Sequence, residues 1–141
     1  MKVRLDPITH VILQAGSTTP DGVDTYEGAP DDYSIQKYTF NYTGLNIDNT
    51  VKLSDFTINE TWLVEQDLEV RQQKLNDVII YMRTQLISNN TEFAKFIVDS
   101  RVSRDDYANG TDAFITWVNN TFPTKTYYTL ARKTDLINIL N

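Results

Sequence analysis

The chain has 141 residues, no cysteine and a formal net charge of −6. A chain of this length buries enough apolar surface to fold without disulfides, and the missing thiols exclude thiolate metal sites and thiol nucleophiles. We therefore expect a single domain over residues 1–141.

The negative charge is concentrated in the first half. Residues 1–65 hold four Lys/Arg and ten Asp/Glu, whereas residues 66–141 hold nine of each. Because an acidic surface repels phosphate, we expect no direct binding of nucleic acid.

No stretch approaches the ~18 apolar residues of a membrane span, so we expect no membrane association. Pro7 and His10 interrupt the first apolar run, which favours an intracellular origin over a signal peptide.

The first segment, 1–15, reads as an N-terminal arm or an edge strand. Pro7 lacks the N–H that a central strand position needs. Four apolar side chains of this segment share one parity: Val3, Leu5, Val11 and Leu13. Residues 16–32 follow as a long acidic loop, because Gly and Pro interrupt every periodicity there.

Strands are expected over 33–58. Tyr38, Phe40 and Tyr42 alternate with polar residues, which predicts a half-buried strand with these rings inward. Tyr33 and Ile35 have the opposite parity, so we expect them to be free, with the acidic loop before them, to meet a partner. Residues 51–58 predict a second strand, broken at Ser54-Asp55.

One long helix is expected over 65–88, where apolar residues recur at helical spacing. Its turn Val78–Met82 is apolar on all sides. That turn must therefore be covered twice, either by strands of the same chain or by a neighbouring subunit. Ile80 and Tyr81 are the candidates for the second contact.

Two shorter helices are expected over 90–120, one capped by Asn90 or Thr91 and one capped by Thr111. Residues 124–141 read as a short strand, KTYYTLARK, and a helical turn from Thr134. Strands precede helices along the chain, which indicates an α+β fold: a strand-rich N-terminal half with an extended arm, then one long and two shorter helices.

No pattern of catalytic residues is present. His10 is the only histidine and no G-x-S-x-G motif accompanies it, so a structural role is favoured. With one His and no Cys, a zinc site is excluded. Residues 105–116 resemble a calcium loop, but Tyr107 and Thr116 stand where ligands are required, which favours a turn and a helix cap. No glycine-rich phosphate motif occurs. We expect no enzyme activity, no metal, no cofactor and no small-molecule substrate.

Two binding alternatives depend on single segments. KTYYTLARK mixes basic and aromatic residues that suit single-stranded nucleic acid, but a packed strand is the favoured interpretation. The acidic loop at Asp21–Asp32 leaves open a weak divalent-cation site or an enzyme that uses these carboxylates.

The cysteine-free composition, rich in Asn, Thr, Tyr and Asp, resembles small virion proteins of tailed bacteriophages, such as neck, tail-completion or capsid-accessory subunits. The resemblance implies a virion protein assembled in the host cytoplasm, with other virion proteins and copies of itself as partners. Arm exchange and burial of the Val78–Met82 turn would make the contacts. The expected interface residues are Val3, Leu5, Val11, Leu13, Tyr33, Ile35, Ile80 and Tyr81. The alternative is a small acidic inhibitor or adaptor that binds a basic host protein.

Overall fold

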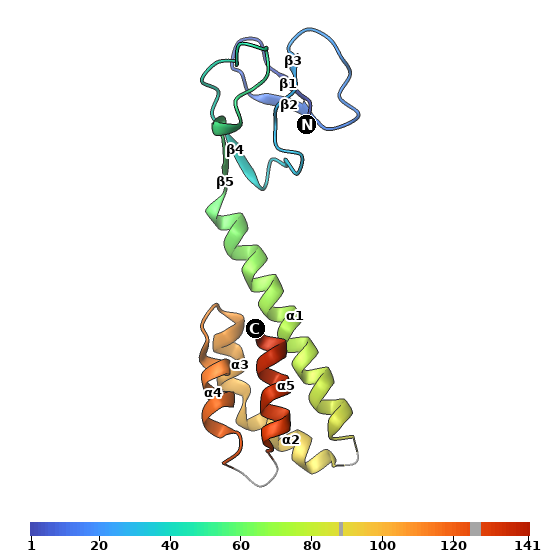
Figure 1. The fold of residues 1–141 in the computed structure, drawn as a ribbon, viewed down its shortest axis with the longest axis vertical. Helices are drawn as coiled ribbons and strands as arrows, with labels where there is room; N and C mark the ends of the chain where they lie inside the picture. Colours follow the sequence, from blue (N-terminus) through green and yellow to red (C-terminus); the bar gives the residue numbers. More distant parts are fainter. Residues whose placement is uncertain (88, 125–127) are drawn as a thin grey trace. The chain divides into compact units, whose positions relative to one another are not determined.

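A computed structural model describes residues 1–87, 89–124 and 128–141 (Figure 1). Its strands precede its helices, which confirms the α+β class. Where the sequence predicted one domain, contacts within the chain group into two compact units, Met1–Val64 and Glu65–Asn141. Each unit is described by itself.

The first unit holds a three-stranded antiparallel sheet in the order β2-β1-β3. Its strands are β1 (Val3–Leu5), β2 (Ile12–Ala15) and β3 (Thr25–Tyr26). The N-terminal segment is thus a hairpin, which corrects the expected arm: β1 is the central strand, not a free extension. Pro7 lies in the turn, outside the hydrogen-bonded ladder. Residues 16–32 are also less irregular than expected, because β3 within them pairs with β1.

A second, two-stranded sheet pairs β4 (Tyr38–Phe40) with β5 (Phe56–Ile58). The strand expected over 51–58 is interrupted at the predicted break by the 3-10 helix η1 (Leu53–Asp55). Asp55 is buried there, and its carboxylate accepts hydrogen bonds from the Thr43 backbone N–H at 3.0 Å and from the Thr43 hydroxyl at 2.7 Å. One side chain therefore ties η1 to the segment that follows β4.

The core of the first unit is small. Its buried apolar residues are Val3, Leu5, Ala29 and Val51. Phe40 and Tyr42 pack against them, as their alternation predicted, whereas Tyr38 does not belong to this core. The prediction that all three rings point inward therefore holds for Phe40 and Tyr42 but not for Tyr38.

The second unit is built on α1 (Glu60–Gln85), whose first turn falls in the first unit. The helix starts before the predicted residue 65 because nothing in the sequence between 60 and 64 breaks it. Leu75, Val78 and Met82 are buried along one side of α1. This side packs on helices, so the cover predicted from the chain's own strands is not the one that forms.

Three helices occupy the region in which two were expected: α2 (Asn90–Asp99), α3 (Arg101–Ala108) and α4 (Ala113–Thr121). The α2 cap is Asn89, one residue before the predicted position, and its side chain accepts from the Glu92 N–H at 3.1 Å. The missed helix is α3, whose last turn carries the Asp-Asp pair that we interpreted as part of a turn.

The last helix, α5 (Leu130–Leu140), is capped by the Thr129 hydroxyl. The strand predicted over 125–133 is wrong for 130–133, which are helical, and residues 125–127 lie outside the described residues. Figure 1 shows α5 between α1 and the α3–α4 pair. Lys74 on α1 donates to the Leu140 carbonyl at 3.2 Å, which ties the end of α5 to α1.

Gly28 marks the closest backbone approach in the first unit. Its φ is +111°, and a Cβ placed there would lie 2.6 Å from the Val51 carbonyl oxygen. We expect Gly28→Ala to lower the free energy of unfolding by about 2 kcal/mol or more, since both the backbone strain and the clash oppose it. Urea denaturation of the full chain measures this.

Gly22→Ala is the matched control, because a Cβ added to Gly22 would meet no atom within 4 Å and its φ is not in the left-handed range. Its stability should stay within about 0.5 kcal/mol of the natural chain. Equal effects at the two glycines would contradict the assigned packing of Gly28.

Candidate protein-contact sites

The structure separates the eight expected interface residues into distinct groups. Val3 and Leu5 are 0% and 2% exposed in the core of the first unit, so they cannot meet a partner; this part of the expectation is wrong. The physical reason is that Val3 and Leu5 point to the sheet face that packs on Ala29 and Val51, whereas Arg4 between them points to the exposed face. Val11 and Leu13 remain about half exposed on and beside the edge strand β2.

Val11, Tyr33 and Ile35 are brought together in one hollow of about 280 Å³, which we call the aromatic hollow. It lies between the β1–β2 hairpin and β4. The lining residues are Val11, Ile12, Tyr33, Ile35, Tyr38, Thr39 and Phe40. Three residues that the sequence singled out thus share a surface, although Val11 is distant in the chain from Tyr33 and Ile35.

A hydrogen-bonded turn holds Ile35 at the rim of the aromatic hollow. The Tyr38 N–H donates to the Ser34 carbonyl at 3.0 Å, and the Lys37 N–H donates to the Ser34 hydroxyl at 3.2 Å. Ile35 projects from this turn with 79% of its surface exposed. An aliphatic side chain of this size is therefore presented to solvent on a fixed backbone.

Aromatic contacts form the floor of the aromatic hollow. The Tyr33 ring stacks on Tyr38 at 6.1 Å between centroids and meets Phe56 edge-on at 5.6 Å. Phe40 contacts Phe56 at 4.7 Å. Rings locked against each other lose little conformational freedom on binding, which is a property of aromatic contact surfaces.

The charges beside the aromatic hollow neutralise each other. The Asp32 carboxylate accepts from the Lys37 ammonium and from the Tyr38 hydroxyl, and these hydrogen bonds lower the pKa of Asp32 and raise the pKa of Lys37. The Lys37 ammonium also lies 4.7 Å from the Trp62 ring centroid. A partner would consequently meet aromatic and aliphatic surface here, not an isolated charge.

The acidic loop is also largely engaged within its own unit. Asp21 pairs with Lys2 at 2.6 Å, and Asp31 pairs with the N-terminal amine at 3.2 Å. The hydrogen bond from Lys2 lowers the pKa of Asp21. Both carboxylates nevertheless stay exposed, so whether the loop meets a partner stays a prediction. His10 stacks on Tyr42 at 4.1 Å, and the described part of the chain holds no cluster of three His, Asp or Glu residues that suits a metal ion.

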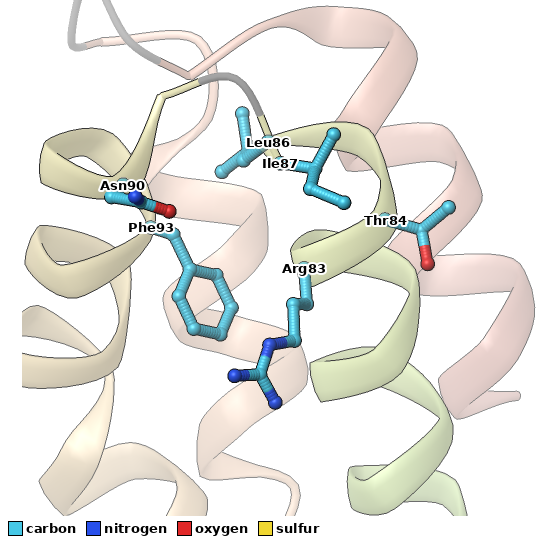
Figure 2. A pocket seen from close by; sticks show the side chains of 6 residues that line it. All are labelled: Arg83, Thr84, Leu86, Ile87, Asn90 and Phe93. Carbon is cyan, nitrogen blue, oxygen red and sulfur yellow. The ribbon is translucent and has the colours of Figure 1, made fainter.

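On the second unit, a hollow of about 440 Å³ lies between α1 and α2 (Figure 2). Figure 2 shows Arg83 and Phe93 projecting from the two helices into the space between them, with Ile87 at its rim. The remaining lining residues are Thr84, Leu86 and Asn90. We call it the helix hollow.

Ile80 and Tyr81 have different surroundings on α1. Ile80 is 62% exposed, so one residue of the Val78–Met82 turn remains uncovered, as the apolar run predicted. Tyr81 is half-buried, and its hydroxyl donates to the Asp135 carboxylate on α5. Burial and this hydrogen bond raise the pKa of Tyr81 to about 12. Tyr81 therefore serves the contact between α1 and α5.

Sequence reasoning missed the residues of the helix hollow. Arg83 follows Ile80 by three residues and Ile87 follows Arg83 by four, which is a detectable signal that they share its face. Phe93 on α2 packs against the core of the second unit and also lines the helix hollow.

No protein-family model, no curated protein and no solved structure matches this chain. Within residues 1–87, 89–124 and 128–141, no helix combines the length and apolar character that a membrane crossing requires.

The Tyr81–Asp135 contact predicts a loss of stability in alkali. The folded-state pKa of about 12 exceeds the ordinary value of 10.0, so the unfolded chain loses this proton first as pH rises. The contribution is fully present below pH 10 and is lost between pH 10 and about 12. We expect Tyr81→Phe to lose less stability than the natural chain between these limits, as measured by denaturation followed by helical circular dichroism. Parallel pH curves for the two proteins would disprove the assignment.

Proposed function

We propose that this chain is a non-enzymatic structural or assembly subunit of a tailed-phage virion, of the neck, tail or capsid-accessory type. It acts through protein–protein contacts with other virion proteins and with copies of itself. The virion assignment comes from the compositional resemblance. The observation that carries the contact role is the aromatic hollow, where Val11, Tyr33 and Ile35 converge.

Desolvation supplies the energy of the proposed contact. Contact energy in protein interfaces is concentrated in a few aromatic and aliphatic side chains that seat in pockets. The aromatic hollow offers a pocket with a preformed floor, and Ile35 offers a side chain that a partner can bury. Burying one such side chain contributes about 1.5–3 kcal/mol.

The mode of contact differs from arm exchange. Residues 3–5 and 12–15 pair with each other, and Val3 is buried, so exchange would require the sheet of the first unit to open. The contact that we propose uses the surface of the folded unit.

The alternative of an acidic inhibitor has less support. Asp21, Asp31 and Asp32 already pair with cations of their own unit. A basic host protein would have to compete with these partners for each carboxylate.

The direct test is the composition of the particle. An antibody against the chain should detect it in density-purified phage particles from the source culture, at a constant ratio to the other particle proteins and resistant to a moderate salt wash. Its absence from particles, while it is present in the infected cells, would disprove the virion assignment.

Ile35→Asp tests the aromatic hollow. We expect this variant to be lost from purified particles because a charge at the rim resists desolvation, while its stability stays within about 0.5 kcal/mol since the side chain is exposed. Immunoblotting of particles, with urea denaturation of the isolated protein, measures both.

Ile47→Asp is the control. Ile47 is fully exposed in the same unit, at 107%, and it does not line the aromatic hollow. Incorporation of Ile47→Asp at the natural level, with loss of Ile35→Asp, supports the site. Equal incorporation of both variants would remove the aromatic hollow from the proposal.

A further inference from the structure

A stripe of exposed residues follows the side of α1 that faces away from its core. Its members recur at alternating spacings of four and three residues, and Ile87 follows in the turn directly after the helix. We call it the outer stripe: Glu69, Gln73, Asn76, Ile80, Arg83 and Ile87. All six side chains are exposed.

This spacing has a geometric meaning. Positions that repeat every 3.5 residues on average keep facing a second helix laid alongside the first. The buried residues Leu75, Val78 and Met82 occupy the opposite side of α1. Arg83 and Ile87 at its C-terminal end also line the helix hollow beside α2, but all six side chains remain exposed, so a second helix can lie along the outer stripe.

The charges of the outer stripe are separated by sign and have no partners among the described residues. Arg83 stands near its C-terminal end, whereas Glu69, with Glu65 one turn before it, stands near its N-terminal end. In the described residues, none of the three makes an ion pair or a side-chain hydrogen bond, unlike Arg71 on another side of α1, which bonds Asp67 at 3.0 Å. Figure 2 shows the Arg83 guanidinium reaching into open space beside Phe93.

We propose that the occupant of the outer stripe is a second copy of the chain, with the two α1 helices antiparallel. An antiparallel partner places Arg83 of each copy beside Glu69 of the other, and a parallel partner would place like charges together. The contact is self-complementary, as a two-fold interface requires. Because the outer stripe carries opposite charges at its two ends, a second copy of the same helix face complements it.

The register follows from the same positions. Glu69 and Arg83 are fourteen residues apart, or roughly 21 Å along the helix. Asn76 lies midway between them, so it would sit on the two-fold axis, and a polar residue at one seam position is a known way to fix helix register. Ile80 would then cover the aliphatic stem of the partner's Gln73, which removes its exposed surface from water.

This inference rests on the proposed contact function and names one of its partners. Sedimentation equilibrium of the full chain, as a concentration series at low salt, tests it. We expect a reversible dimer, and we expect Arg83→Glu and Glu69→Arg each to raise its Kd by about tenfold or more, because each substitution opposes like charges. The double variant Glu69→Arg/Arg83→Glu restores both pairs and should return the Kd to near the natural value.

Arg101→Glu is the matched control, since it makes the same charge change at an exposed position on α3. It should leave the Kd unchanged. A strict monomer at the highest concentration, a single variant that dimerises like the natural chain, or a double variant without recovery would each overturn the pairing. A monomer that still enters phage particles would leave the proposed function standing, and a dimer that is absent from particles would refute that function alone.

Discussion

The constraint on which the second unit depends is that α1 buries only one of its sides against the other helices. Val78 and Met82 reach the core, and Tyr81 is held at its edge by Asp135 on α5. These contacts fix α1 against α5, and the Lys74 bond to the end of α5 extends the same packing. The same contacts determine which residues of α1 stay exposed. Because one side of α1 packs on the core, Ile80 on another side faces away from it. The exposed stripe of α1 is a consequence of the internal packing and not an independent feature.

The first unit has short strands and a small core, so it buries little apolar area. Hydrogen bonds accepted by carboxylates hold part of its structure. Asp6 accepts from the Ile8 and Thr9 N–H groups at 2.8 Å, Asp48 binds Thr50, and Asp55 binds Thr43 from a buried position. Side chains of this type satisfy turn amides that no strand could reach. The acidic composition of this half thus has an internal explanation, which is why it is poor evidence for a basic partner.

The periodicity of apolar residues predicted the elements that are long enough to show a period. Alternation identified β4, and helical spacing identified α1. Strands of two to four residues, such as β3, are too short to show a period, so their pairing with β1 had to come from tertiary contacts. The α3 helix was hidden because Asp and Asn near its end favour turns. Among the expected contact residues, Val3 and Val11 share parity in the sequence, yet Val3 is buried and Val11 is half exposed. The turn at residues 7–9 and the register shift between Arg4 and Leu5 break the alternation between them.

The carboxylates that hold the turns of the first unit also make it responsive to protons. Hydrogen bonds lower the pKa values of Asp6, Asp21, Asp32 and Asp48, led by those from Thr9, Lys2, Lys37 and Thr50 respectively, from an ordinary value of 3.8. Their contribution is present above that value and disappears as the medium acidifies through the lower folded-state values. All four belong to residues 1–64, and Asp32 adjoins the aromatic hollow. Strong acid would therefore loosen several turns of the first unit through small protonation events, and that of Asp32 would release Lys37 and Tyr38 beside the aromatic hollow.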